Sequence, residues 1–316
     1  MNPTLRKILM AVLGIAIGGL CLWLSARTVD WTEASHIFRS ADLGSIAVGV
    51  ALYGVAMVMR ALRWRAILAF RAPVSAGMSL QALATGYAVN AALPARLGEL
   101  FRADYLARRT GLSRSAVLAS IFIERLLDLL AVVGILAIGL ALAGGGDAAS
   151  RNVLVGGGVV AAIGVGVLLL IATRLSEANA EAVLSRLIAR LPGGKVIAAR
   201  LGSMLGDFAQ LLRVVRTPRF LLIVLGTLPI WAVEICSIWS ICGAVGLELN
   251  LAGMLSLMGG ASLSTLLPTA PGYVGSYQFA FVLILGQFGV GATTAIVAAT
   301  TVQIYVIGGY TLIGLL

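Results

Sequence analysis

The chain contains nine apolar segments, most of them close to the length that crosses a lipid bilayer. Crossing the hydrocarbon core as an α-helix takes about 20 apolar residues, and a helix satisfies its backbone hydrogen bonds internally at that depth. Only 11% of the 316 residues are charged, against about 25% in a soluble protein. We therefore predict an all-α integral membrane protein with no sizeable soluble domain. The segments are 8–24, 43–59, 74–93, 115–143, 153–173, 220–243, 251–267, 273–288 and 292–316.

Basic residues predict which linkers are cytoplasmic, because Lys and Arg concentrate in cytoplasmic loops. Of the 23 basic residues, 19 lie before residue 8 or within 60–71, 96–114 and 174–219. These stretches and the N-terminus are therefore predicted to be cytoplasmic, and the linkers richer in acidic residues external. The first apolar segment is interpreted as a retained anchor, with a cleaved signal peptide as the alternative. No Lys or Arg follows Arg219, so charge does not orient the last part of the chain.

Segment 74–93 cannot cross the membrane if the linkers on both of its sides are cytoplasmic. It must then enter and leave on the same side. Gly86 and Pro94 interrupt it, and Asn90 adds polarity. A broken segment is tolerated at membrane depth only where protein or a watery cavity satisfies its backbone. We therefore predict a re-entrant segment here.

A second interrupted segment has the same spacing of glycine and proline as the first. Both have the spacing G-x7-P-x3-G, with leucine before the proline, and the second should enter from the opposite face. Interrupted segments in inverted repeats point to a central binding site. The repeated positions are Gly86, Pro94 and Gly98 in the first segment and Gly260, Pro268 and Gly272 in the second.

The predicted architecture is a polytopic helical bundle of about seven full spans plus two interrupted, re-entrant segments, arranged as an inverted repeat. Residues 1–316 form a single polytopic membrane domain, with approximate halves 43–173 and 220–316. The linker 174–219 between them carries apolar stripes opposite arginines. It is predicted to form amphipathic helices on the cytoplasmic leaflet, and a helical hairpin packed over the bundle is the alternative.

Ionisable side chains inside the apolar segments are the first candidate functional residues, because a charge in hydrocarbon is costly. Glu124, Arg125 and Asp128 lie well inside segment 115–143. Glu124 and Asp128 share a helix face, and Arg125 and Asp128 can pair. Glu234 lies in the middle of 220–243 with no neighbour in sequence to neutralise it.

More charged residues follow the first interrupted segment. Arg96 lies beside the break, where a headgroup phosphate would arrive, and arginine binds phosphate through a planar fork. Glu99 and Arg102 follow, one helical turn apart. The alternative is that all these charges form an internal salt-bridge network that only fixes the bundle.

The sequence lacks the motifs of several enzyme classes. The string Gly193-Gly194-Lys195-Val196 fails the last position of a Walker A motif, and neither G-x-S-x-G nor H-E-x-x-H occurs. His36 is the single histidine. We therefore expect no cofactor, no metal and no enzymatic activity. The net charge of +10 is attributed to membrane topology and anionic lipids rather than to nucleic acid.

Four stretches of the chain resemble the transmembrane region of the lysylphosphatidylglycerol synthase/flippase family. The stretches keep the family's order and span most of the chain. The resemblance implies a stand-alone, flippase-like membrane domain without the aminoacyl-transfer domain of the bifunctional members. The stretches are R-A-L-R-W at 60–64, N-A-A-L-P-A-R-L-G-E-L-F-R-A-D-Y-L at 90–106, A-S-I-F-I-E-R-L-L-D at 119–128 and L-P-T-A-P-G-Y-V-G-S-Y at 267–277.

The resemblance also implies which residues matter, by position in these stretches. Glu234 joins them because of its depth in an apolar segment. The candidate substrate-binding and translocation residues are therefore Asn90, Pro94, Arg96, Glu99, Arg102, Glu124, Arg125, Asp128, Glu234, Pro268, Pro271 and Gly272, with Gly98 and Gly275 also matching the family pattern.

The leading hypothesis is a lipid flippase or transporter of the bacterial inner membrane that works without ATP hydrolysis. It would move a phospholipid, a hopanoid or a polyisoprenoid-linked lipid between leaflets. One alternative is an intramembrane enzyme acting on a lipid-linked phosphate with Arg96, Arg102 and Glu124. The other is a non-catalytic membrane partner of an envelope lipid biosynthesis complex. Membrane lipids are the expected partners; a homo-oligomer and envelope lipid enzymes stay open.

Overall fold

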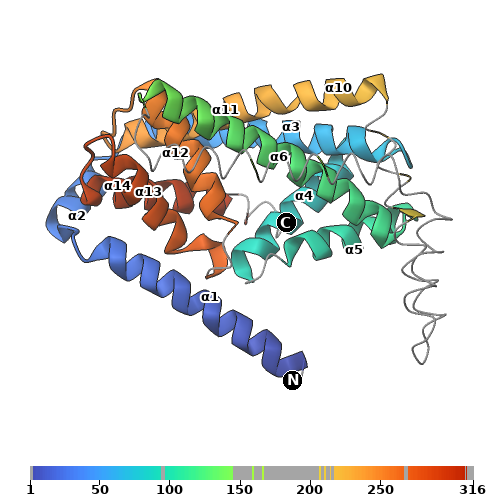
Figure 1. Ribbon diagram of the computed structural model, residues 1–316, viewed down its shortest axis with the longest axis horizontal. Coiled ribbons are helices and arrows are strands. Elements are labelled where there is room, and N and C mark those ends of the chain that lie inside the picture. The colour runs from blue at the N-terminus through green and yellow to red at the C-terminus, as the bar shows by residue number, and fades with distance from the viewer. Residues whose placement is uncertain are drawn as a thin grey trace.

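All the regular secondary structure in the described part of the chain is helical in the computed structural model (Figure 1). The structure describes residues 3–93, 97–144, 159, 166, 206, 207, 210, 214, 217–266, 270–309 and 311. The described residues of the predicted apolar segments lie mostly in these helices. Segment 153–173 falls almost wholly outside the described residues, and so does the end of segment 292–316. The helices are α1 (Pro3–Ala26), α2 (Trp31–Arg39), α3 (Leu43–Leu68), α4 (Ala76–Ala92), α5 (Gly98–Thr110), α6 (Arg114–Leu142), α10 (Pro218–Leu225), α11 (Thr227–Ala244), α12 (Leu251–Ser264), the 3-10 turn η2 (Pro271–Tyr273), α13 (Ser276–Gly286), α14 (Ala292–Val302) and the π-helical turn η3 (Gln303–Ile307).

Polar side chains fix where the central helices begin. A short polar side chain at the N-cap accepts a hydrogen bond from an otherwise unpaired backbone N–H. Asp42 does this for α3, Ser75 for α4, Ser113 for α6 and Asn250 for α12. Helix α5 ends at Thr110 and is capped by Gly111, whose φ of 71° is a left-handed conformation that glycine adopts readily.

Among the described residues, three helical stretches are long and apolar enough to cross a membrane: Leu43–Leu68, Arg114–Leu142 and Pro218–Ala244. The first and last of these lie side by side and antiparallel. The start of α3 meets the end of α11, where the Asp42 N–H donates to the Ala244 carbonyl oxygen over 2.9 Å. Midway along, the Ser237 hydroxyl donates to the Gly49 carbonyl oxygen over 2.6 Å. The structure thus has the character of a helical membrane protein.

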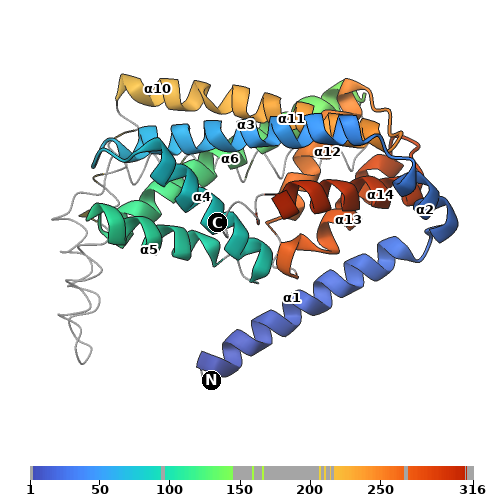
Figure 2. The same cartoon turned by 180° about the vertical axis from the view of Figure 1, so that it is seen from behind.

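Two helical hairpins enter this frame from opposite ends and meet in the middle (Figures 1 and 2). Helix α4 begins near the end of α3 and runs to the centre, and α5 returns from there to the start of α6. Helices α12 and α13 make the corresponding turn from the other end. The two tips touch, since α4 packs against η2.

The repeated glycines lie at corresponding places in the two hairpins, with different partners. A Cβ at Gly98 would lie 1.9 Å from the Gly86 carbonyl oxygen, so α4 and α5 can approach this closely only with glycine there. In the second hairpin, a Cβ at Gly260 would lie 2.2 Å from Ile284 Cδ1. The shared spacing therefore marks close backbone packing in the first hairpin, whereas Gly260 faces the end of an isoleucine side chain and a Cβ at Gly272 would lie 3.7 Å from the Ala91 carbonyl oxygen of α4.

The expectation of a basic linker from residue 60 onward is wrong for its first part. Helix α3 continues to Leu68, and Arg60 and Arg63 are buried side chains of that helix. The predicted segment ended at Met59 because an arginine follows it. The sequence pattern does not distinguish an arginine that flanks a membrane segment from one that is paired inside the protein.

Most of the linker 174–219 lies outside the described residues, and so do the two amphipathic helices predicted there. Its described residues contact the bundle: Asp207 pairs with Arg71 at 2.8 Å, and Val214 is buried in a cluster that includes Ile67 and Ile123.

Candidate functional site

Seven charged side chains from four helices form one buried network. Their side chains are at most 11% exposed, except that of Arg125, which is 33% exposed. Burying so many charges is costly unless each is paired. The network therefore depends on its internal geometry. Its members are Arg60 and Arg63 from α3, Arg102 from α5, Glu124, Arg125 and Asp128 from α6, and Glu234 from α11.

The two arginines of α3 tie α6 to α11. Arg60 forms ion pairs with Asp128, at 3.1 Å, and with Glu234. Arg63 pairs with Asp128 at 2.7 Å and donates to the Thr227 hydroxyl over 2.9 Å. Their three-residue spacing puts both on one helix face, so a single face of α3 neutralises carboxylates from two neighbouring helices.

The first hairpin is tied to the same network through Arg102. This side chain pairs with the fully buried Glu124 at 2.6 Å, and its guanidinium lies 3.5 Å from the ring centroid of Trp64. Trp64 in turn donates to the Ser120 hydroxyl over 2.9 Å. Glu124 also accepts from Arg125 at 3.1 Å. Glu124 therefore belongs to the part of the network that does not line the cavity, and it orients two arginines.

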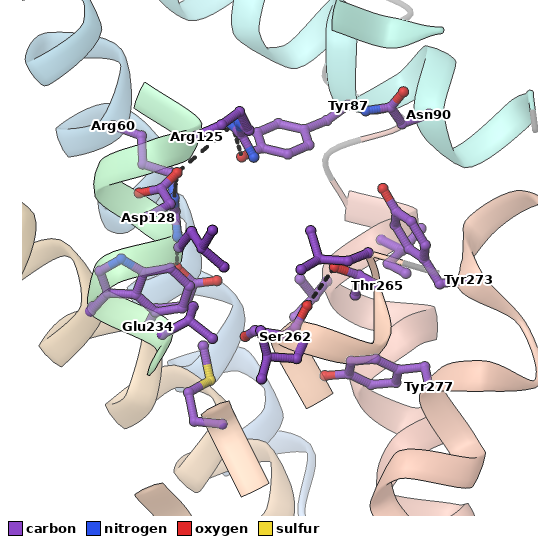
Figure 3. Close-up of a pocket in the computed structure, with 18 of the residues that line it drawn as sticks. Arg60, Tyr87, Asn90, Arg125, Asp128, Glu234, Ser262, Thr265, Tyr273 and Tyr277 are labelled. Carbon is purple, nitrogen blue, oxygen red and sulfur yellow. Dashed lines mark hydrogen bonds and ion pairs between the residues drawn. The ribbon is translucent and has the colours of Figure 1, made fainter. Parts of the chain in front are cut away.

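A cavity of about 500 Å³ opens beside the network, between the tips of the two hairpins. This volume is in the range of pockets that bind small organic ligands. The described residues contain no group of three His, Cys, Asp or Glu side chains close enough to hold a metal ion. In Figure 3, the sides of the cavity differ in chemistry: Arg60, Asp128 and Glu234 lie together on one side, Ser262, Thr265, Tyr273 and Tyr277 on the other, and Arg125, Tyr87 and Asn90 between them.

A side-chain amide holds the first hairpin tip. The Gly98 N–H, the first of α5, donates to Asn90 Oδ1 over 2.7 Å. The first backbone N–H groups of a helix lack hydrogen-bond partners within that helix. Asn90, near the end of α4, provides an acceptor for the first N–H of α5. The same side chain donates from Nδ2 to Glu99 over 3.5 Å and lines the cavity.

Two glutamines hold the second tip. Gln278 accepts from the Gly275 N–H over 2.8 Å and donates to Gln303. Gln303 donates to the Gly272 carbonyl oxygen over 3.1 Å. Tyr273 lies between these glycines with a φ of 62°, which is uncommon for a residue other than glycine. This backbone places the Tyr273 ring against the cavity (Figure 3).

The structure brings most of the predicted site residues together. Asn90, Glu99, Arg125, Asp128 and Glu234 line the cavity. Two more, Arg102 and Glu124, lie in the network behind it, and Pro271 and Gly272 form the turn η2 that carries Tyr273. The other predicted residues, Pro94, Arg96 and Pro268, lie outside the described residues.

Sequence reasoning missed Arg60, Arg63 and the neutral side of the cavity. The signal for the arginines was R-A-L-R-W, in which two arginines and Trp64 share one helix face next to an apolar segment. The stretch L-P-T-A-P-G-Y-V-G-S-Y contains Tyr273 and Tyr277 but does not single them out. No sequence signal marks Gln303, because isolated glutamines in apolar helices are common.

The comparison with known families supports the same reading of the chain. The family described as "Lysylphosphatidylglycerol synthase TM region" matches residues 11–314. The chain belongs to this family. All described residues of the network and the cavity fall within the matched range.

A relative with a curated description is the glycosyltransferase AglD of Haloferax volcanii. It is 25% identical over 342 aligned residues, which cover 99% of this chain and 54% of the relative. The chain thus spans about half the length of the curated relative that it matches. Together, the family and the relative indicate a membrane protein with a lipid-related function.

Proposed function

We propose that this protein moves a lipid with a polar headgroup between the two leaflets of a membrane, without ATP hydrolysis. The observation that carries the proposal is the cavity between the two hairpin tips, which offers ionised and hydroxyl groups inside a bundle of apolar helices. A phospholipid, a hopanoid or a polyisoprenoid-linked lipid fits this description. The protein acts as a transporter rather than as an enzyme.

The physical argument concerns the headgroup. A lipid crosses slowly because its polar headgroup must leave water, and burying an unpaired polar or charged group is costly. The cavity replaces water with Arg125, Asn90 and the tyrosines while the acyl tails stay in the surrounding lipid. Large apolar side chains exposed on α3 and α11, such as Val48, Val55 and Leu228, suit such surroundings.

In the proposed topology, the long direction of α3 and α11 runs across the membrane. The N-terminus and the Arg-rich ends of α3 and α5 face the cytoplasm, in keeping with the concentration of basic residues in cytoplasmic loops. The chain then has about seven full spans, and α4–α5 and α12–α13 are re-entrant hairpins of an inverted repeat. The proposed location is the inner, or plasma, membrane of a bacterial cell.

A second candidate is an intramembrane enzyme acting on a lipid-linked phosphate, or a membrane partner of an enzyme that does. The observation that favours it is the name of the relative AglD, a glycosyltransferase of which the chain matches about half. A chemically altered lipid after incubation with the pure protein would support the enzyme. Loss of assembly without any change in lipid distribution would support the partner.

The test is reconstitution of the pure protein into liposomes that carry headgroup-labelled phospholipids or a labelled isoprenoid phosphate. We expect protein-dependent exposure of label to a reducing agent on the opposite leaflet. Arg125→Gln should slow this by at least about tenfold, equivalent to ~1.4 kcal/mol, because the cavity loses its exposed cation.

The matched control is Arg109→Gln, which removes an exposed arginine in the last turn of α5, away from the cavity. This variant should leave the rate of lipid movement unchanged. If the folded protein moves none of the lipids, the transport proposal is wrong. Lipid extracts would then be compared before and after incubation for a chemical product.

A further inference from the structure

Arg125 is the arginine of the network without a carboxylate of its own. Arg60 and Arg63 pair with Asp128, and Arg60 also with Glu234. Arg102 pairs with Glu124 at 2.6 Å. Arg125 shares Glu124 at 3.1 Å and reaches Asp128 only at 3.9 Å. Arg125 also donates to the Tyr87 hydroxyl over 3.4 Å. Its Nε, like those of Arg63 and Arg102, has no hydrogen-bond partner among the described residues. What sets Arg125 apart is its exposure, the greatest in the network, and its place in the lining of the cavity.

Glu99 is the complementary group on the first hairpin tip. Its Oε1 accepts only a long hydrogen bond, 3.5 Å, from Asn90. Its Oε2 is buried and has no partner within the described part of the chain. Most buried polar atoms in proteins are hydrogen-bonded, and leaving one unpaired is costly. The Glu99 side chain also lines the cavity, so a ligand there can reach it.

These two groups of opposite charge border the same small gap. A second cavity of about 10 Å³ is lined by both Arg125 and Glu99, together with Tyr87, Asn90 and Arg102. That is roughly the space that one water molecule needs. No ion pair of 4 Å or less joins Glu99 to Arg125 among the interactions of the described residues. A headgroup that reaches this gap can therefore contact both side chains.

Resting on the proposed function, we propose that the cavity recognises a headgroup in which a phosphate lies next to a hydrogen-bond donor. Arg125 binds the phosphate, because a guanidinium forms paired, charge-assisted hydrogen bonds to phosphate oxygens. Glu99 accepts from the donor, which is an ammonium or a hydroxyl group of the same headgroup. The lipid thus gives a further partner to Arg125, which shares its carboxylates with other arginines, and to Glu99 Oε2, which has no partner among the described residues.

The experiment measures binding of three soluble short-chain lipids to the purified full-length protein by isothermal titration calorimetry. Dihexanoyl phosphatidylethanolamine offers an ammonium donor, the phosphatidylglycerol analogue offers hydroxyl donors, and the phosphatidylcholine analogue has a phosphate but no N–H or O–H donor. We expect the first two to bind at least about tenfold more tightly than the third, in keeping with the strength of hydrogen bonds to charged groups. Whichever of the first two binds more tightly identifies the donor.

Two variants assign the roles. Arg125→Gln should weaken all three lipids, because all three carry the phosphate. Glu99→Gln should weaken the ethanolamine lipid by about tenfold and the choline lipid hardly at all, since only the former donates to the carboxylate. The control is Glu33→Gln on the exposed face of α2, which should change none of the affinities.

The assignment is overturned if the choline lipid binds as tightly as the other two to the wild-type protein, or if Glu99→Gln weakens all three equally. The wild-type series decides the question even if a variant does not fold. Selective binding without transport in liposomes would contradict the proposed function and support the headgroup assignment. Transport without headgroup selectivity would support the proposed function and contradict the headgroup assignment.

Discussion

Arg60 and Arg63 hold three helices together through very few atoms. Asp128 receives both guanidinium groups, at 3.1 and 2.7 Å, and none of the three side chains is more than 9% exposed. A buried ion pair of this kind gives little net stability relative to apolar packing. Removing one partner strongly lowers the free energy of unfolding, because the other charge is left buried and unpaired.

Asp128→Asn should therefore destabilise the protein by about 3–5 kcal/mol, because two buried arginines lose their shared carboxylate. The measurement is the midpoint of denaturant-induced unfolding in detergent micelles. Asp104→Asn is the matched control: Asp104 pairs with the exposed Arg108 and Arg114, and surface pairs are worth only about 0–1 kcal/mol. Equal shifts for the two variants would contradict the importance of burial.

The hairpins α4–α5 and α12–α13 are built for close contact between their own helices. The first has no room for a Cβ at Gly98, which faces the Gly86 carbonyl oxygen and Asn90 Oδ1. The second uses glycine on α12 against an isoleucine of α13. The first hairpin therefore depends on glycine at a fixed position, and both tips are held by a side-chain amide.

Gly98→Ala should open the first hairpin. The new methyl carbon would start 1.9 Å from the Gly86 oxygen and 2.6 Å from Asn90 Oδ1, so the hydrogen bond from the Gly98 N–H to Asn90 should break. We expect loss of at least about 2 kcal/mol of stability, measured as the unfolding midpoint, and loss of lipid transport.

Gly54→Ala is the control for this substitution. Gly54 lies within α3, and a Cβ there would have no neighbour within 4 Å. Alanine is the better helix former by roughly 0.8–1.0 kcal/mol, so this variant should be neutral or more stable. Similar losses for both glycines would mean that close packing of α4 on α5 is not what Gly98 provides.

At the scale of the whole molecule, the two hairpins approach the centre from opposite ends (Figures 1 and 2). The start of α4 and the end of α5 lie at one end of the bundle. Helix α2 and the end of α13 lie at the other, where the Asp30 N–H donates to the Thr293 hydroxyl at the start of α14. If the bundle spans the membrane as proposed, these two groups of residues face opposite sides.

Single cysteines test this arrangement in a background without Cys21, Cys236 and Cys242. Ala76→Cys and Arg109→Cys, at the two open ends of the first hairpin, should react with an impermeant reagent only after the cells are opened. Ser35→Cys and Gln287→Cys should react in intact cells. All four positions are exposed. Reaction of residues 76 and 109 from opposite sides would show that the α4–α5 segment crosses the membrane.

The sequence by itself determined the class of fold and most of the charged residues of the candidate site. Long apolar segments can be stable only as buried or membrane-embedded helices. A charge within them, as at Glu124, Asp128 and Glu234, must find a partner. Those inferences need only composition and spacing, and the structure agrees with them: each of these carboxylates is paired with an arginine.

Only the tertiary structure decided which residues are partners and where the cavity lies. Arg60 is 68 residues from Asp128 and 174 from Glu234, a pairing that no local pattern encodes. The neutral side of the cavity comes from Tyr273 and Tyr277, whose placement depends on how the second hairpin tip turns and packs against α4. Such contacts depend on how helices distant in sequence approach one another, which local periodicity does not specify.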